Sequence, residues 1–392
     1  MTGGGSGGHI TPILAVASEL KRLQPDIRIV YIGQKGDKLA DIPAQHPAID
    51  EVRMVRAGKF RRYHGVGWKQ FFFISTQAKN LRDAIYVLIG LWQSFWLMRQ
   101  LKPQVTFTRG GFVSVPVAFG GYLNHVPYIT HDSDSLPSLA NRIIARKAVL
   151  HAVAQPAETY PYPLKRTITV GIPLSDSYQL ITPDMQQNYR RELGFEAYKR
   201  LLFITGGGNG AKKLNNLIVA NVPVLLERYP DLIIVHVAGR AMEQAINQTY
   251  DQVVVDPAQR QRIRVESFIH DLYRYNGAAD VVITRGGATT LAELAVQGKA
   301  CIVVPAKQLV WNVRNVEALA AQQAIIPFDE DHSTQEQSLA AIVTELMDDE
   351  RKRSHLADNF HKLAHPDAAK RLAEILLDIA NKQTNSHELK KT

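Results

Sequence analysis

The chain has 392 residues, of which 45% are hydrophobic, 21% charged and 8% aromatic. This composition excludes a wholly disordered or collagen-like chain, and the length suggests about two domains. The net charge of +9 favours an anionic partner: nucleic acid, an anionic membrane surface or a phosphorylated substrate. The single cysteine, Cys301, excludes an intramolecular disulfide and a four-cysteine zinc site, and it fits a reducing, cytoplasmic compartment.

The chain begins with a glycine-rich run, Gly3–Gly8, and has no apolar stretch typical of a signal peptide. Such a loop normally follows a strand, yet only Met1 and Thr2 precede it. We therefore expect either a trimmed or mis-assigned start or a sheet without its usual first strand. In the second case neighbouring strands would be partly unpaired, and stability or activity would be weakened.

Short apolar runs alternate with stretches of helical spacing along the whole chain. Strands are predicted at residues 27–32, 105–108, 126–130, 166–170, 201–205, 232–236, 262–265, 281–284 and 301–304. Helices are predicted at residues 10–22, 136–146, 214–228, 289–297 and 367–382. The alternation predicts a doubly wound α/β fold with parallel sheets. Since the pattern runs through twice, we expect an N-terminal domain at 1–171, a second domain at 172–364, and a final helix with a polar tail at 365–392.

The most hydrophobic segment, residues 84–98, is 15 residues long. A spanning helix needs about 20 apolar residues, so we predict a helix that is buried or lies on a surface. Upstream of it, basic residues precede the aromatic run Phe71–Phe73, an arrangement that suits an anionic membrane surface. A nucleic-acid role is disfavoured because no binding module accompanies them. The basic residues are Arg56, Lys59, Arg61, Arg62, His64 and Lys69.

Each half of the chain carries a glycine loop that leads into a helix, Gly3–Gly8 and Gly206–Gly210. Glycines let backbone N–H groups approach an anion closely, and a helix N-terminus adds partial positive charge. Such loops bind phosphate without a metal, and the chain lacks the Gly-Lys-Ser/Thr of a P-loop. His9 directly follows the first loop, so it is a candidate general base whose neutral form the helix N-terminus favours.

Two further segments follow predicted strands and open helices. In the first, Gly286 and Gly287 expose backbone donors, and Glu293 lies about two turns into the helix, where a carboxylate can accept two ribose hydroxyls. In the second, Asp132 and Asp134 form an Asp-x-Asp pair. Such pairs hold metal ions in some sugar-nucleotide enzymes, but aspartate also caps helices, and we favour the cap.

Taken in order, these motifs resemble those of the MurG family of cell-wall glycosyltransferases. Gly4–His9 resembles the family's first glycine loop and catalytic histidine, and Gly110–Ser114 with Pro116 resembles its second acceptor-side loop. Phe268-Ile269 resembles the segment whose backbone contacts uracil. Residues 285–293 resemble the donor motif whose glutamate binds ribose. The resemblance covers nearly the whole chain.

The resemblance implies two Rossmann-like domains facing across a cleft, the GT-B arrangement, and an inverting transfer of N-acetylglucosamine from its uridine diphosphate to an undecaprenyl-diphospho-muramoylpeptide. It implies no cofactor and no metal, and it places the protein peripherally on the cytoplasmic side of the cell membrane. His9 is the implied catalytic base. The implied substrate-binding residues are Ser6, Gly7, Gly8, Asp134, Gly207, Gly208, Asn209, Ile269, Gly287, Ala288, Thr289, Glu293 and Asn312.

The chain departs from the family pattern at sugar and phosphate contacts. It has His131-Asp132-Ser133-Asp134 where the family has His-Glu-Gln-Asn, and Ser175 where the family has an arginine near the diphosphate. Three alternatives therefore stay open: a related transferase with another sugar or lipid acceptor, an epimerase of UDP-sugars, and a catalytically inactive scaffold of cell-wall assembly.

Overall fold

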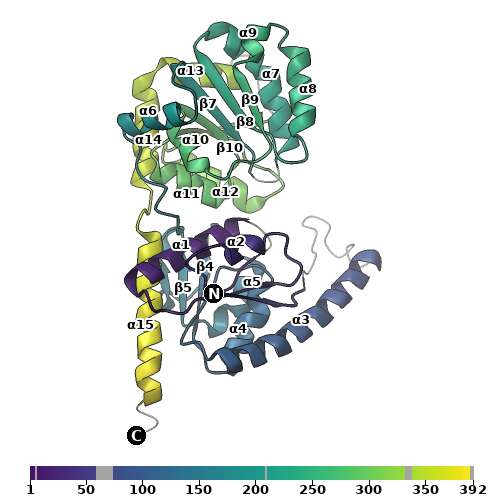
Figure 1. Ribbon diagram of the computed structural model, residues 1–392, viewed down its shortest axis with the longest axis vertical. Helices are drawn as coiled ribbons and strands as arrows, with labels where there is room; N and C mark the ends of the chain where they lie inside the picture. The colour runs from purple at the N-terminus through teal and green to yellow at the C-terminus, as the bar shows by residue number, and fades with distance from the viewer. Residues whose placement is uncertain (5–6, 59–73, 208–209, 332–337, 389–392) are drawn as a thin grey trace. The chain divides into compact units, whose positions relative to one another are not determined.

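The computed structural model describes residues 1–4, 7–58, 74–207, 210–331 and 338–388, with the backbone alone for 74–79 and 386–388. The chain forms two compact units (Figure 1). Unit 1 comprises Met1–Asp176 together with the C-terminal segment from Pro366, and unit 2 comprises Ser177–His365. Every strand pair among the described residues is parallel, which confirms the predicted doubly wound α/β class.

Unit 1 is built on two short parallel sheets joined by a bridge at Thr2. Its strands are β1 (Val30–Gln34), β2 (Glu51–Val55), β3 (Thr106–Thr108), β4 (Tyr128–Asp132), β5 (Leu150–Val153) and β6 (Thr167–Thr169). Its helices are α1 (Gly7–Leu23), α2 (Asp41–Ala44), α3 (Ile74–Leu101), α4 (Ser114–Leu123), α5 (Leu139–Ile144) and α15 (Ala368–Glu388).

The start of the chain lies between the two sheets of unit 1 and joins them. Thr2 bridges in parallel to Ile32 of β1 on one side and to Thr108 of β3 on the other. Its N–H donates to the carbonyl of Phe107 at 2.8 Å, and the N–H of Ile32 donates to the carbonyl of Met1 at 2.8 Å. The place that a first strand normally fills is therefore held, among the described residues, by this bridge.

The core of unit 1 explains why the last helix belongs to it. Ile13, Val16 and Leu20 recur on one face of α1 and are buried against the sheet. Leu372 and Leu376 of α15 enter the same cluster, and Figure 1 shows α15 beside α1. Helix α15 thus returns to unit 1 after the chain has completed unit 2.

Unit 2 contains a six-stranded sheet in the order β12-β11-β10-β7-β8-β9. Its strands are β7 (Arg200–Thr205), β8 (Leu232–Val237), β9 (Ile263–Glu266), β10 (Val281–Thr284), β11 (Ala300–Val303) and β12 (Ile326–Pro327). Its helices are α6 (Pro183–Glu192), α7 (Lys212–Arg228), α8 (Glu243–Val253), α9 (Pro257–Arg260), α10 (Leu272–Ala278), α11 (Ala288–Val296), α12 (Val310–Ala320), α13 (Leu339–Asp348) and α14 (Glu350–Lys362).

The side chains of β7 are buried on both faces of this sheet. Side chains alternate across a strand, so Leu202 and Ile204 join the cluster that α7 and α13 cover, while Leu201 and Phe203 join the cluster on the opposite face, with α10 and α11. This two-sided burial accounts for the continuous hydrophobic strands of the sequence.

The segment at residues 84–98 is helical, as predicted, and it lies within the longer helix α3. One face of α3 is exposed to solvent, as shown by Leu81, Ile85, Leu88, Trp92 and Trp96 at 51–68% exposure. Among the residues that the structure describes, no helix combines the length and the hydropathy needed to cross a bilayer.

Candidate functional site

In unit 1 the loop that enters α1 lies against the loop that leaves β3. The two are tied together because Thr2 pairs with Thr108 and the N–H of Arg109 donates to the carbonyl of Thr2 at 3.0 Å. Gly111 has φ +79°, and a Cβ there would lie 3.2 Å from the carbonyl oxygen of Gly4. Glycine at 111 thus permits both the left-handed backbone and the close approach of the two loops.

His9 lies in the first turn of α1, three residues before Pro12, and is partly buried. Its Nδ1 is 3.1 Å from the carbonyl oxygen of Arg109. A carbonyl can only accept, so Nδ1 carries the proton and Nε2 is left as the acceptor. Burial, and next the charge of Arg109, lower the pKa of His9 to about 4. The ring is therefore neutral at pH 7, chiefly through burial rather than through the helix N-terminus.

Arg109 has a buried side chain that extends toward the predicted Asp-x-Asp pair. Its guanidinium donates to Ser133 Oγ, and burial lowers the pKa of Arg109 to about 10, against the opposing charges of Asp134 and Asp132. Asp134 is partly buried, and its carbonyl oxygen accepts from the Tyr160 hydroxyl at 2.9 Å. Arg109 thus links the histidine to the Asp-x-Asp segment, a link that the sequence analysis missed although Arg109 directly precedes Gly110.

Asp132 is a structural carboxylate. It is 3% exposed, and its two oxygens accept from the Tyr162 hydroxyl at 2.7 Å, from Asn141 Nδ2 at 2.8 Å and from the N–H of Ser138 at 3.2 Å. Ser138 in turn caps α5. These bonds tie β4 to the start of α5. The cap of α5 is Ser138, so the prediction that the Asp-x-Asp pair caps this helix is wrong: Asp132 accepts from the N–H of the cap residue instead.

Unit 2 has the second loop cluster at the point where its strand order reverses. From β7 the chain proceeds through β8 and β9 on one side and then returns to β10 on the other. Thr205 and Thr284, the last residues of β7 and β10, are paired, so Gly206 and Arg285 leave the sheet side by side. Ligands of open α/β sheets bind in the crevice at such a switch point.

The loop after β10 presents the predicted donor motif. Gly287 is the N-cap of α11, and nothing lies within 4 Å of where its Cβ would be. Ala288 and Thr289 form the first turn of α11, partly buried, with Glu293 on the second turn. The N–H of Gly287 donates to the carbonyl of Arg285 at 2.9 Å, and Ala288 and Thr289 follow at the helix N-terminus, where backbone N–H groups bind anions.

The carboxylate of Glu293 has a raised pKa. It is partly buried, and burial raises its pKa to about 7, while a hydrogen bond from the hydroxyl of Tyr178 opposes that rise. Tyr178 carries no sequence signal that connects it with position 293, so sequence reasoning missed it.

Asn312 and Ile269 have packing roles alongside any contact with a ligand. Asn312 is 5% exposed, and its Oδ1 accepts from the N–H of Ala306 at 2.9 Å, which leaves its Nδ2 as the donor for other contacts. Ile269 is 6% exposed and is buried among the apolar residues of the sheet, in the loop between β9 and α10. Its backbone is therefore held at the carboxyl end of β9.

In the glycine loop after β7, Gly207 has φ +82° and donates to Thr205 Oγ1 at 3.3 Å. Gly210 has φ +71°, and a Cβ there would lie 2.3 Å from the carbonyl oxygen of Ala238. Several predicted residues fall outside the described part of the chain: Ser6, Gly208, Asn209, Lys59, Arg61, Arg62, His64, Lys69 and Phe71–Phe73.

Models of two protein domains match the chain. Residues 1–152 match the N-terminal domain of glycosyltransferase family 28, and residues 201–372 match its C-terminal domain.

Curated relatives match over nearly the full length. A UDP-N-acetylglucosamine–N-acetylmuramyl-(pentapeptide) pyrophosphoryl-undecaprenol N-acetylglucosamine transferase of Natranaerobius thermophilus is 30% identical over 96% of this chain and 98% of the relative. The Bacteroides fragilis protein of the same name is 28% identical, over 97% and 95%.

Solved structures share the fold. The crystal structure of MurG from Acinetobacter baumannii has a TM-score of 0.69 at 22% identity, covering 96% of this chain and 98% of that one. UDP-GlcNAc 2-epimerase from Neisseria meningitidis has a TM-score of 0.62 at 12% identity, covering 96% and 99%. At these identities the likeness concerns the fold alone.

Proposed function

The chain belongs to the MurG family within glycosyltransferase family 28, and on that premise we propose that it transfers N-acetylglucosamine from UDP-N-acetylglucosamine to an undecaprenyl-diphospho-muramoylpentapeptide. The reaction is the one that the names of its curated relatives state. The observation that carries the assignment of residues is the pairing of Thr205 with Thr284, which brings two glycine loops together at the switch point of unit 2.

Unit 2 binds the donor in this proposal. The diphosphate meets backbone N–H groups of the glycine loop and of the α11 N-terminus, and Glu293 accepts hydrogen bonds from the ribose hydroxyls. The backbone of Ile269 contacts the uracil, and Asn312 contacts the sugar through Nδ2. The residues assigned to the donor in these two loops are Gly207, Gly208, Asn209, Gly287, Ala288 and Thr289.

Unit 1 supplies the base. The fixed tautomer of His9 leaves Nε2 to accept the proton of the acceptor hydroxyl, whose oxygen attacks the anomeric carbon. The bond from that carbon to the diphosphate breaks, UDP leaves with the electron pair, and the configuration inverts. Ser6, Gly7, Gly8 and Asp134 are assigned to substrate contacts in this unit.

The donor assignment is tested by titrating the full chain with UDP-N-acetylglucosamine. Glu293→Gln is expected to weaken binding at pH 8.5 by roughly 10- to 100-fold, because it removes bonds to a charged acceptor. Glu317→Gln, at an exposed glutamate of α12, is the matched control and should bind like the unaltered chain. Equal binding by both variants would contradict the role of Glu293.

We further propose that unit 1 docks on the anionic surface of the membrane through the exposed face of α3. Leu81, Leu88 and Trp92 of that face are 66–68% exposed. The sole acidic residue within α3, Asp83, is buried beside Arg82. Helix α3 also carries the exposed Arg82 and Arg99, and a surface that combines basic and exposed apolar side chains matches the chemistry of an anionic interface.

Co-sedimentation with vesicles that contain anionic phospholipid tests this surface. Replacing Trp92 and Trp96 together by glutamate should lower the bound fraction severalfold, because it removes apolar insertion and adds negative charge. Val255→Glu is the control, since Val255 is 83% exposed and lies in unit 2. Undiminished binding by the tryptophan variant would contradict the proposal.

A further inference from the structure

Three neighbouring strands of the unit 2 sheet end in one line. Thr205 of β7 pairs with Val237 of β8, and Val237 pairs with Glu266 of β9. The loops that leave β7, β8 and β9 therefore start side by side at the carboxyl edge of the sheet, where ligands of such sheets bind (Figure 1). The first is the glycine loop, and the third leads to Ile269. The loop after β8, which begins at Ala238, lies between them.

The loop after β8 is in direct contact with the glycine loop. A Cβ on Gly210 would lie 2.3 Å from the carbonyl oxygen of Ala238 and 3.1 Å from the Cα of Gly239. Asn215, in the first turn of α7, donates through Nδ2 to the same carbonyl of Ala238 at 2.9 Å. The next residue, Arg240, therefore extends from a backbone that is held against the last glycine of the loop.

The side chain of Arg240 reaches the loop after β9. Its guanidinium carbon lies over the ring of Phe268, 3.9 Å from the ring centroid. The ring of Phe268 also packs against that of His270 at an angle of 82°, with centroids 4.8 Å apart. A cation over an aromatic ring is attracted by the charge distribution of the ring, so this contact gives the exposed arginine a preferred position.

The charge of Arg240 has no anionic partner in the part of the chain that the structure describes, where its guanidinium takes part in no hydrogen bond and no ion pair. Arg285, the arginine that follows β10, differs in this respect. It pairs with Glu330 at 2.8 Å and donates to the carbonyl of Val304 at 3.1 Å. The cation at position 240 can therefore pair with an anionic ligand at this edge without breaking a bond within the protein.

We propose that Arg240 binds the diphosphate of the nucleotide donor and that the ring of Phe268 holds its guanidinium in position. The inference rests on the proposed function, which assigns the diphosphate to the glycine loop and the uracil to the backbone of Ile269. A nucleotide that spans these two contacts runs alongside Arg240, because the Arg240 backbone adjoins the glycine loop and its guanidinium lies over the residue before Ile269. The planar guanidinium offers paired N–H donors that match two phosphate oxygens. Since the ring already orients the side chain, less conformational freedom is lost when the ligand binds.

Equilibrium titration of the full chain with UDP and with uridine tests this role, because uridine lacks the diphosphate. Arg240→Gln should weaken UDP binding by about tenfold and leave uridine binding unchanged, since it removes hydrogen bonds between charged groups. Raising the salt concentration from about 50 mM to about 300 mM should weaken UDP binding by the unaltered chain more than by Arg240→Gln, because salt screens the charge pair that the variant lacks.

Arg351→Gln is the matched control, because it removes the same charge from an exposed position of α14 in the same unit. It should bind UDP and uridine like the unaltered chain, with the same dependence on salt. Thermal unfolding should show equal midpoints for Arg240→Gln, Arg351→Gln and the unaltered chain, since both arginines are exposed.

Two further variants test the part assigned to the ring. Arg240→Lys keeps the charge without the planar fork, and it should weaken UDP binding by about threefold. Phe268→Leu should weaken UDP binding by about threefold when Arg240 is present and should have no further effect when combined with Arg240→Gln. An equal loss in both backgrounds would show that the ring does not act through the arginine, and that half of the proposal would be wrong.

The outcomes separate this inference from the proposed function. If the unaltered chain binds UDP and Arg240→Gln binds it as tightly, the role of Arg240 is wrong and the donor site stands. If Arg240→Gln weakens UDP and uridine equally, or Arg351→Gln weakens UDP as much, the contact with the diphosphate is wrong. If the unaltered chain binds no UDP, the proposed donor site itself is wrong, and the inference fails with it.

Discussion

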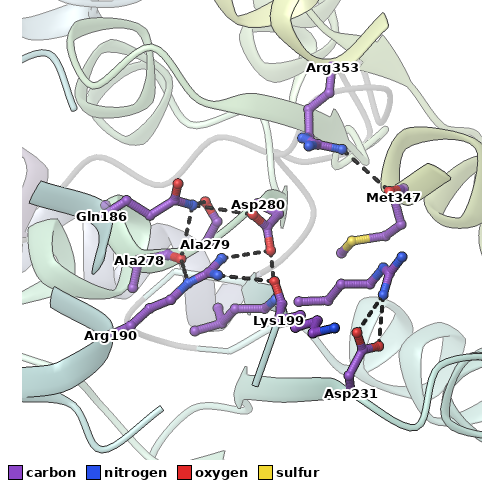
Figure 2. A network of polar contacts seen from close by, with 12 residues as sticks. Gln186, Arg190, Lys199, Asp231, Ala278, Ala279, Asp280, Met347 and Arg353 are labelled. Atoms are coloured by element: carbon purple, nitrogen blue, oxygen red, sulfur yellow. Dashed lines mark hydrogen bonds and ion pairs between the residues drawn. The ribbon is translucent and has the colours of Figure 1, made fainter. Parts of the chain in front are cut away.

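Two ion pairs in unit 2 have the same length but different burial, and they predict different losses of stability (Figure 2). Arg190–Asp280 and Arg200–Asp231 are both 2.7 Å long. The side chains of the first pair are 14% and 16% exposed, and those of the second are 31% and 29% exposed. Water screens the second pair more strongly, so its contribution to the free energy of unfolding should be smaller.

Arg190→Met should cost about 3 kcal/mol, the lower end of the range for breaking a buried pair. Two hydrogen bonds from Arg190 to backbone carbonyls are lost as well, to Ala278 and Lys199. Arg200→Met should cost about 1 kcal/mol, as is typical of exposed pairs. Methionine keeps much of the apolar stem of arginine in both cases, so the comparison isolates the charged head.

Native-state hydrogen exchange of the amides of β7 and β10 measures the free energy of opening unit 2 without interference from unit 1. A loss of 3 kcal/mol corresponds to exchange that is roughly a hundredfold faster, and 1 kcal/mol to about fivefold. Equal acceleration by Arg190→Met and Arg200→Met would refute the argument from burial.

Two further predictions concern glycine geometry and pH. Gly210→Ala should destabilise unit 2 by about 2 kcal/mol or more, because the added Cβ would lie 2.3 Å from a carbonyl oxygen. Gly207→Ala has no such clash and should cost only about 1 kcal/mol, the strain of a left-handed backbone at a non-glycine residue. Urea unfolding of the two variants measures both losses. Burial lowers the pKa of His236 from 6.5 to about 4 in the folded chain. The contribution of His236 to stability is therefore complete above pH 6.5 and falls by about 1.4 kcal/mol per pH unit toward pH 4, as the unfolded state takes up the proton. Urea unfolding at several pH values should show a slope that His236→Asn makes shallower by that amount; a slope that His236→Asn leaves unchanged would contradict the assignment.

The strands and helices that were predicted best are those whose own residues carry the signal. The strand at residues 281–284 was predicted at its observed bounds, because four β-branched residues form a run that is buried on both faces. Strand β5 was missed because His151 interrupts its apolar run. In the fold this histidine bonds to Thr130 Oγ1 at 2.8 Å and stacks on Tyr162, and neither partner is near it in sequence.

The same distinction applies to the candidate site. The glycine loop after β7 and the segment from Gly286 to Glu293 could be named as candidates because each follows an apolar strand directly. The hydrogen bond that fixes the tautomer of His9 comes from Arg109, 100 residues away. The ring of Tyr178 packs edge-on against that of Tyr273 in α10, a contact between distant parts of the chain that no local pattern encodes. The features that could not be predicted are thus those that depend on contacts between residues far apart in the sequence.

The most direct test of the central claim is single-turnover transfer of radiolabelled N-acetylglucosamine from its uridine diphosphate to an undecaprenyl-diphospho-muramoylpentapeptide, with donor binding measured in parallel. The unaltered chain should form the glycosylated lipid. His9→Ala should slow transfer by roughly 10²–10⁴ while it binds the donor normally, because the proton then lacks its acceptor. Full turnover by His9→Ala, or no product from the unaltered chain, would contradict the account.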